Sequence, residues 1–363
     1  MRVNYKDLEK YAEEILLKGG FDAEEAAFMS KELVMANLVG YDSHGVIRIP
    51  QYLDQMKMGK IVPGAKIEVV KETPTTAIVD GHLKFGQMVG YAMADIVMEK
   101  AEKYGMGCAV SLNAAHAGRV GSYTEYIAGK GFLAFCTVGL CYDKPLAPWG
   151  AKESRMGTNP ISWAVPRKGS FPVFMDGSMT VVAEGKIRTY VQKGEQVPLG
   201  WIMDGEGRDT TDPMALYRDP PGTIYPVGGR TSGGVKGSAL AVMANMFSLA
   251  LANDDYWSHD KQLAENGIFL MAIDPDAFFG REAYEAQVLN HSNYIKSAAP
   301  AEGFDKVMMP GEYEHENYER LTREGIDLPP DTWNGLIAIA KSLGCEWSKD
   351  LEAAETSAGF VRY

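Results

Sequence analysis

The sequence predicts a mixed α/β protein with more than one packed unit, and three observations lead to this prediction. The 363 residues exceed the roughly 100 to 200 residues of a usual domain. Strand-like and helix-like segments alternate between residues 76 and 140. The composition, with 46% apolar and 23% charged residues, is that of an ordinary folded protein. The chain is therefore able to bury a sizeable core.

Two helices are predicted at the start of the chain. Apolar residues recur at helical spacing in the first helix, at Leu8, Tyr11, Ile15 and Leu16. Gly19 and Gly20 suit the end of that helix. Asp22 followed by Glu25 resembles a capping box, in which each side chain accepts a hydrogen bond from the other residue's backbone N–H. The second helix can therefore begin there and extend to Gly40.

The pattern changes at about Thr76, where the segment TTAIVDG is typical of a strand. A long amphipathic helix follows from Phe85 to Tyr104, and GCAVSL is a second strand, so a βαβ unit is predicted. A helix over residues 122–129 and a strand FLAFCTVGL come next. The centre of the chain is therefore predicted to be α/β.

Short strands interrupted by glycine and proline are predicted after Trp149, namely ISWAVP and FPVFMD, with a hairpin or extended loop over residues 194–212. A glycine-dense stretch, 228–237, leads into the most apolar segment, 238–252. That segment is shorter than the roughly 20 residues of a membrane span, so it is predicted to be a buried helix. A strand GIFLMAID, a helix over 276–291 and a closing helix over 331–343, stopped by Gly344, complete the chain.

Charge and cysteine content exclude several functional classes. The formal net charge of -12 repels phosphate backbones and anionic lipids, so neither nucleic acid nor a membrane is an expected partner. The cysteines show no C-x-x-C pair and no zinc-ligand spacing, and they are expected to be free thiols without a metal: Cys108, Cys136, Cys141 and Cys345. Cys136 and Cys141, in an apolar strand-like segment, are expected to be buried and without a catalytic role. The N-terminus lacks the order of a signal peptide, which favours a cytoplasmic location.

Common catalytic and nucleotide-binding motifs are missing from the sequence. There is no G-x-G-x-x-G between a strand and a helix, so a Rossmann domain is not supported. The sequence also has no P-loop, no G-x-S-x-G elbow and no H-E-x-x-H helix.

Two histidines in polar, glycine-containing segments are the main candidates for chemistry. His44 lies near Arg48, and His116 lies near Arg119. Reduction of a carbonyl group needs a proton donor and a cation for a substrate carboxylate, and histidine and arginine suit these tasks. A structural histidine is the commoner alternative in such turns. The other histidines are expected to face solvent: His82, His259, His291 and His315.

Several ordered motifs resemble the malate/L-lactate dehydrogenase family. The longest are YDSHGVIRIPQY (residues 41–52), NAAHAGRVGSY (113–123) and GTNP (157–160). Shorter matches follow the family order over nearly the whole chain: APWG (147–150), Asp176 with Ala183 and Gly185-Lys186, Lys236-Gly237, and Pro310-Gly-Glu312.

The resemblance implies a fold that is not of the Rossmann type. Its central cofactor-binding domain has a largely antiparallel sheet with helices, and helical parts precede and follow it. In this chain the helical N-terminal part is expected over residues 1–75, the central domain over 76–300, and a C-terminal part that packs with the N-terminal one over 301–363. The resemblance also implies a homodimer with active sites near the subunit interface.

The resemblance further assigns roles to individual residues. His116 matches the general acid/base, while His44 beside Ser43 faces substrate and nicotinamide, and which histidine transfers the proton stays open. Arg48 is expected to bind the substrate carboxylate, with Tyr52 and Asp143 in the same pocket. The residues expected to bind NAD or NADP are His44, Tyr142, Thr158, Asn159, Asp176, Gly177, Ser178, Lys236, Pro310, Gly311 and Glu312.

Three departures from the family pattern concern cofactor and substrate choice. Val235 stands where the family usually has histidine, Met179 interrupts a small-Thr-Ser stretch, and the segment 252–267 is longer than is common. The choice between NAD and NADP and the exact substrate therefore stay open. The expected substrate is a small 2-oxo or 2-hydroxy acid of the malate, lactate, sulfolactate or ureidoglycolate type, and a cyclic imino acid is the alternative. Two other classes remain: a hydrolase or lyase with Asp143 or Asp176 as the partner of His116, and a silent dimer that only binds a metabolite.

Overall fold

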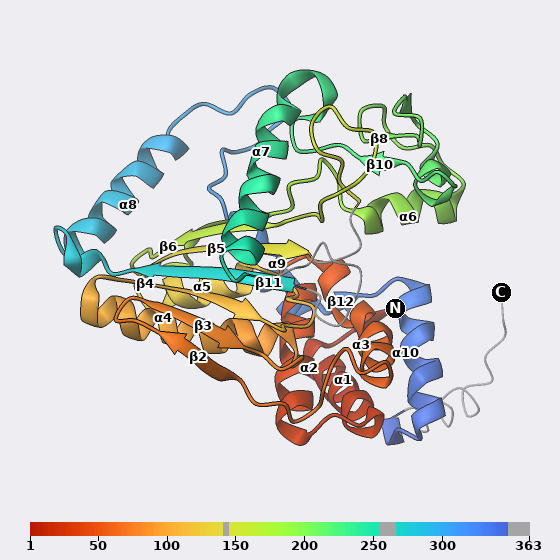
Figure 1. Ribbon diagram of the computed structural model, residues 1–363, viewed down its shortest axis with the longest axis horizontal. Helices are drawn as coiled ribbons and strands as arrows, with labels where there is room; N and C mark the ends of the chain where they lie inside the picture. Colours follow the sequence, from red (N-terminus) through yellow and green to blue (C-terminus); the bar gives the residue numbers. More distant parts are fainter. Residues whose placement is uncertain (141–144, 254–265, 348–363) are drawn as a thin grey trace. The chain divides into compact units, whose positions relative to one another are not determined.

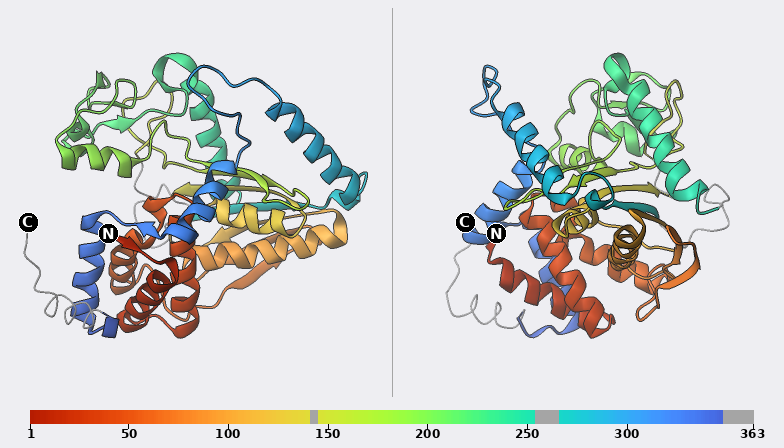
Figure 2. Two further views of the ribbon diagram at one scale, coloured as in Figure 1. Left: turned by 180° about the vertical axis from the view of Figure 1, so that it is seen from behind. Right: turned by 90° about the vertical axis from the view of Figure 1, so that its left-hand side faces the viewer.

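The computed structural model describes residues 1–140, 145–253 and 266–347 (Figures 1 and 2). These residues form two compact units. Unit 1 contains residues 1–65 and those from 312 onward, and unit 2 contains residues 66–311. Among the described residues, no helix combines the length and the apolar character needed to cross a membrane.

Unit 1 is mainly helical. Its elements are β1 (Arg2–Val3), α1 (Tyr5–Gly19), α2 (Ala23–Leu38), the 3-10 turns η1 (Asp42–His44) and η2 (Val46–Arg48), α3 (Ile49–Lys57), α9 (Glu312–Glu324), β12 (Ile326–Asp327) and α10 (Pro330–Leu343). The predicted capping box is confirmed: the Asp22 side chain accepts from the N–H of Glu25 at 2.8 Å, and the Glu25 side chain accepts from the N–H of Asp22. Gly20 ends α1 in the left-handed conformation, as its position predicts.

The N-terminal strand of unit 1 pairs with a segment from late in the chain. β1 pairs antiparallel with β12, and Arg2 and Asp327 form an ion pair of 2.6 Å. The ring of Tyr11 on α1 stacks on Trp347 at 4.4 Å between centroids and also contacts Trp333 on α10. Aromatic pairs of this kind add roughly 0.5–1.5 kcal/mol beyond the area they bury.

Unit 2 is built on a seven-stranded sheet in the order β2-β3-β4-β11-β5-β6-β7. Its strands are β2 (Glu68–Glu72), β3 (Thr76–Asp80), β4 (Met106–Leu112), β11 (Asn266–Ile273), β5 (Leu133–Leu140), β6 (Ile161–Val165) and β7 (Val173–Gly177). β3 and β4 are parallel because α4 (Gly86–Tyr104) connects them as a crossover, and the other neighbouring pairs are antiparallel. The predicted βαβ unit and the non-Rossmann, largely antiparallel α/β fold are confirmed.

Helices cover both faces of this sheet (Figure 1). On one face, α4 and α5 (Gly121–Gly129) pack on alternate strand residues to form a hydrophobic core, with Val79, Val97 and Leu270 fully buried. On the other face lies α7 (Gly234–Asn245), which continues as a π-helical segment, η5 (Met246–Ala250). Phe247 of this segment makes an edge contact with Phe269 of β11, with centroids 5.3 Å apart.

The remaining elements of unit 2 lie between β7 and β11 or, in the case of η6 and α8, after β11. They are α6 (Glu184–Lys193), β8 (Ile202–Met203), β9 (Asp209–Thr210), η3 (Pro213–Tyr217), β10 (Thr223–Ile224), the π-turn η4 (Gly229–Gly233), η6 (Pro275–Ala277) and α8 (Arg281–Lys296). β8 pairs with both β9 and β10, so the polar stretch 194–212 contains a short hairpin. Ile187 of α6 joins Ile202 and Ile224 in a separate small core.

Two helices differ from the sequence prediction. The helix predicted over 238–252 begins earlier, at Gly234, because its glycines allow close packing: a Cβ on Gly237 would overlap the carbonyl oxygen of Val227. One face of this helix is also exposed, with Met243 at 49%. The helix predicted over 276–291 is shifted to Arg281–Lys296, since residues 275–277 form a 3-10 turn.

Replacing Gly86 with alanine is expected to destabilise the protein by about 1–3 kcal/mol through overpacking. Gly86 is the first residue of α4, and a Cβ there would overlap the carbonyl oxygens of Ala115 and His116. This clash outweighs the gain in helix propensity of about 1 kcal/mol. Gly185→Ala in α6 is the matched control, because nothing lies near its Cβ position. Urea unfolding should show a loss for Gly86→Ala alone, and equal stability of both variants would contradict the prediction.

Candidate active site

The turn that carries His44 is built by Asn37 of α2. The buried Asn37 side chain donates to Asp42 Oδ1 at 2.7 Å and accepts from the N–H of Val46 at 3.0 Å. These two bonds close the turn over residues 42–46. Ser43 is exposed and His44 half-buried, and Ser43 Oγ lies 3.0 Å from His44 Nδ1. A hydrogen bond at one ring nitrogen fixes which nitrogen can exchange a proton elsewhere.

Arg48 is attached to the same turn. Its Nε donates to the carbonyl of Ser43 at 2.6 Å, and its Nη1 donates to Gln51 Oε1 at 2.6 Å. A guanidinium has five N–H donors in a rigid fork, so these bonds orient the group and leave donors for a ligand. Ser43, His44 and Arg48 are thus brought together, whereas Tyr52 is fully buried within α3.

His116 lies in unit 2, in the irregular segment that follows β4. The side chain of Asn113, which has a φ of 48°, donates to both carboxylate oxygens of Asp80 at 3.0 and 3.1 Å. The N–H of Ala115 donates to the carbonyl of Lys84 at 3.1 Å. His116 itself is half-buried between these bonds and α5. The segment therefore presents an imidazole from a backbone fixed by the ends of β3 and β4.

Asp176 lies close to the same segment. Its Oδ2 accepts from the N–H of Gly121, the first residue of α5, at 2.8 Å. A helix N-terminus favours a carboxylate at this position. The guanidinium of Arg119, two residues before Gly121, is buried, pairs with Glu125 and lies 5.9 Å from the ring centre of Phe174. Asp176 is thus tied to the helix that follows the His116 segment.

The other cofactor candidates of unit 2 differ in accessibility. Asn159 is fully buried, and its Nδ2 donates to the carbonyl of Ala241 at 2.7 Å and to Asn245 at 2.8 Å, so its side chain holds α7. Half-buried residues are Thr158, Gly177 and Ser178, while Lys236 is exposed in the first turn of α7. The carbonyl of Pro310 accepts from the N–H of Phe174 at 3.3 Å, next to Gly311.

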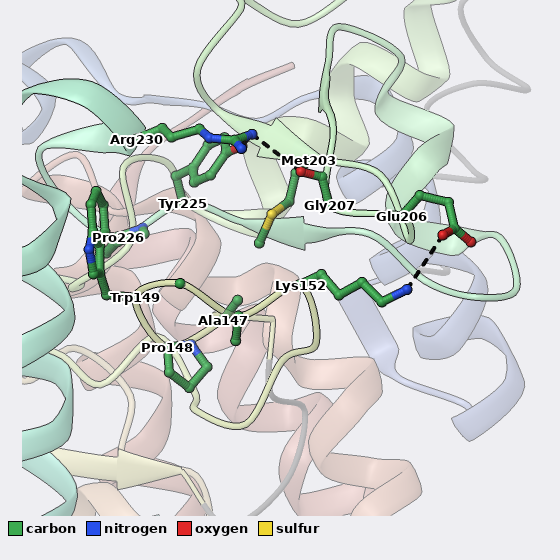
Figure 3. Close-up of a pocket in the computed structure, with 12 residues that line it drawn as sticks. Ala147, Pro148, Trp149, Lys152, Met203, Glu206, Gly207, Tyr225, Pro226 and Arg230 are labelled. Carbon is green, nitrogen blue, oxygen red and sulfur yellow. Dashed lines mark hydrogen bonds and ion pairs between the residues drawn. The ribbon is translucent and has the colours of Figure 1, made fainter.

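A cavity of about 520 Å³ opens in unit 2 between the loop 147–152 and the sheet formed by β8, β9 and β10 (Figure 3). Arg230 on its wall donates to Asp209 and to the Tyr225 hydroxyl, at 3.3 and 3.2 Å. Lys152 and Glu206 form an ion pair of 3.4 Å across another side. Burial, followed by the bond to Asp209, raises the pKa of Tyr225. The wall of the cavity thus contains aromatic side chains, and each of its two cations, Lys152 and Arg230, is paired with a carboxylate.

The thiols and the remaining histidines have ordinary surroundings. Burial raises the pKa of the Cys136 thiol well above its usual value, and the nearby Asp176 carboxylate adds to this rise, so the thiolate form is disfavoured. Within the described residues, no three His, Cys, Asp or Glu side chains are grouped to hold a metal ion. His82 and His291 are exposed as predicted, His315 is half-buried, and His259 lies outside the described residues.

The predicted site residues are divided between the two units. Unit 1 contains Ser43, His44, Arg48, Tyr52 and the buried Glu312, and the other described candidates are in unit 2. Tyr142 and Asp143 lie outside the described residues. Sequence reasoning missed the supporting residues Asn37 and Asn266, because a buried polar residue that bonds to a backbone group brought near by folding belongs to no recognisable motif. It also gave no role to Asp80, or to Tyr123, which ends one of the family motifs.

Comparisons with known proteins agree on one family of dehydrogenases. The family model described as malate/L-lactate dehydrogenase matches residues 3–337. The L-sulfolactate dehydrogenase of Methanocaldococcus jannaschii is 33% identical over 338 residues, which are 91% of this chain and 94% of that protein. The malate dehydrogenase of Pyrococcus abyssi is 31% identical, with 95% of each chain covered. A solved structure described as a putative malate/lactate dehydrogenase from E. coli superimposes with a TM-score of 0.88, at 27% identity, over 97% of this chain and 98% of that one.

Proposed function

The chain belongs to the malate/L-lactate dehydrogenase family and is therefore a hydroxy acid dehydrogenase that uses a nicotinamide cofactor, and on this premise we propose how its residues act. The proposed reaction interconverts a small 2-oxo acid and its 2-hydroxy acid. His116 serves as proton donor and acceptor, Arg48 binds the substrate carboxylate, and Ser43 with His44 orients the reacting groups.

The residues of unit 2 fit a dinucleotide. Lys236 is an exposed cation near the start of α7, where its own charge and the helix dipole favour phosphate. At the end of β7, the nearest atom to a Cβ built on Gly177 is 3.8 Å away, so a flat group can approach the backbone there. We assign to the cofactor the unit 2 residues Lys236, Gly177, Ser178, Thr158, Asp176, Pro310 and Gly311, with Asn159 acting through the position of α7. Glu312, which is buried in unit 1, is left without a direct contact to the cofactor.

The hydrogen bonds of the two histidine segments support the proposed substrate roles. A nicotinamide cofactor, when bound, would supply or accept the hydride at C2 of the substrate. Arg48, oriented by Ser43 and Gln51, forms a forked pair with the carboxylate. His116 donates a proton to the substrate oxygen during reduction and takes it back during oxidation. Fixing both reactants lowers the barrier by several kcal/mol, because a bimolecular step becomes a positioned one.

The observation that carries this proposal is the bonding of Ser43, His44 and Arg48 within one turn. Ser43 contacts both partners, through its hydroxyl to the imidazole at 3.0 Å and through its carbonyl to the guanidinium at 2.6 Å. The imidazole that is assigned to orient the reacting groups and the cation that is assigned to the carboxylate are therefore both held by one residue. A 2-oxo acid presents a matching pair of groups on adjacent carbon atoms.

Mixing the protein with NADH or NADPH and a panel of substrates tests the proposal. Oxaloacetate, pyruvate and sulfopyruvate represent 2-oxo acids, and pyrroline and piperideine carboxylates represent cyclic imino acids. We expect loss of the reduced-nicotinamide absorbance with at least one 2-oxo acid, and the faster cofactor identifies the NAD or NADP preference. Turnover with imino acids alone would show that the substrate is a cyclic imino acid and not a 2-oxo acid. Product formed without cofactor would indicate a hydrolase or lyase, and binding without turnover would indicate a silent module.

We further propose that the protein is a cytoplasmic homodimer. Unit 2 exposes large apolar side chains on and before α8, with Phe279 at 97% and Tyr294 at 79%, and on the outer face of α7. α8 stands apart from the sheet of its own unit (Figure 2). Exposed apolar side chains of this size are typical of protein interfaces. Sedimentation equilibrium should give twice the mass of the chain, and a monomer at micromolar concentration would reject the dimer.

A further inference from the structure

We propose that Asn266 and Tyr123 are positioning residues for His116, because they hold both backbone groups of the next residue, Ala117. The N–H of Ala117 donates to Asn266 Oδ1 at 2.7 Å. The carbonyl of Ala117 accepts a hydrogen bond from the Tyr123 hydroxyl. The inference rests on the proposed role of His116 as proton donor and names the residues that set the direction of its imidazole.

The need for these bonds follows from local structure. Residues 115–119 belong to no helix or strand, so their backbone groups find no partners in a regular ladder. Ala117 is 2% exposed and has little access to water. Leaving a buried backbone group without a partner costs roughly 1–3 kcal/mol. Two side chains satisfy both groups instead, Asn266 from a distant strand and Tyr123 from the helix that follows the segment.

Both side chains come from rigid surroundings. Asn266 is 5% exposed and opens β11, the central strand of the sheet, and its own N–H donates to the carbonyl of Ala114 at 3.2 Å. Asn266 therefore bonds to the backbone on both sides of His116. Tyr123 is fully buried on α5, and its ring meets Tyr91 of α4 edge-on at 5.6 Å between centroids. The sheet and the helical layer thus fix the segment from two directions.

This arrangement bears on proton transfer. A proton donor must lie within about 2.6–3.2 Å of the atom that it protonates. A displacement of about 1 Å can cost roughly 100-fold in rate. Packing explains why an aromatic ring is buried at position 123, but it does not explain the hydroxyl group. The closest acceptor of that hydroxyl is the Ala117 carbonyl. The Tyr123 hydroxyl and the Asn266 side-chain Oδ1 therefore have a role that packing does not explain.

Tyr123→Phe is the most direct test, since the ring and its packing are retained. We expect kcat to fall by about 5- to 10-fold with KM unchanged, the effect of one lost hydrogen bond. Asn266→Ala should lower kcat similarly, and Asn266→Asp, which keeps an acceptor oxygen, should restore most of it. Tyr126→Phe is the matched control: Tyr126 lies on the same helix but bonds to Asp95, at 2.9 Å. Its kcat should equal that of the unmodified protein.

A double-mutant cycle separates positioning from a general structural role. If Tyr123 acts through His116, Tyr123→Phe should cause no further loss of kcat in a His116→Ala background. Equal losses in both backgrounds would overturn the inference. The imidazole resonances of His116, identified by their absence in His116→Ala, should also shift or broaden in Tyr123→Phe. Unmoved resonances would reject the positioning role, whereas normal turnover of His116→Ala would instead reject the proposed function, so the two failures are distinguishable.

Discussion

Replacing His116 with alanine is expected to lower turnover of the 2-oxo acid by about 10²–10⁴-fold, the usual contribution of a general acid. Substrate binding should change little, because Arg48 and not His116 is assigned to the carboxylate. Reduction consumes a proton, so turnover of the unmodified protein should fall as the pH rises and the donor loses its proton. The variant should lack this fall. Steady-state rates across a pH series provide the measurement.

His44→Ala is the comparison that decides between the two histidines. If His44 only orients the reacting groups, its variant should lose less activity and keep the pH dependence of the unmodified protein. The bond of 3.0 Å between Ser43 Oγ and His44 Nδ1 supports this orienting role. A flat pH profile in His44→Ala, together with a normal profile in His116→Ala, would transfer the proton-donor role to His44.

Arg48→Met is expected to reduce kcat/KM for the carboxylate substrate by about 10- to 100-fold, since charge-assisted hydrogen bonds contribute roughly 1.5–3 kcal/mol. Arg48→Lys should recover only part of the loss, because an ammonium keeps the charge but lacks the fork that bonds to Ser43 and Gln51. The discriminating measurement uses the methyl ester of the same substrate. Its kcat/KM should be low for the unmodified protein and nearly unchanged by Arg48→Met.

Lys57→Met provides a matched control for the loss of a cation from the same part of the chain. Lys57 ends α3, is exposed, and forms only a surface pair of 3.4 Å with Asp54. Such pairs contribute about 0–1 kcal/mol. Kinetic constants should be unchanged in this variant. An equal loss in Lys57→Met would indicate that net charge, and not carboxylate binding by Arg48, governs the rate.

Elements whose signals are local could be predicted from the sequence. The capping box of Asp22 and Glu25 and the βαβ unit of β3, α4 and β4 depend on residues close together in the chain. The place of β11 could not be predicted, because a strand at residues 266–273 pairs with strands at 106–112 and 133–140. Hydrophobic alternation identifies a strand but not its neighbours.

The same distinction applies to the candidate site. His44, Arg48 and His116 were identified from residue type and family motifs, whose spacing is visible in the sequence. Asn37 and Asn266 were not, because each acts through a backbone group that only folding brings within reach. Asn159 shows the opposite case: its motif is visible, but only the structure shows that its amide bonds to Ala241.

The position of β11 between β4 and β5 has a consequence for biosynthesis. While the ribosome has made only the first half of the chain, β4 and β5 lack the strand that separates them, and their edges are exposed to wrong pairing. The sheet can close only after residue 273 has left the exit tunnel. Non-local pairing of this kind slows folding, so nascent chains of this protein are expected to need chaperone protection until residues 266–273 have emerged.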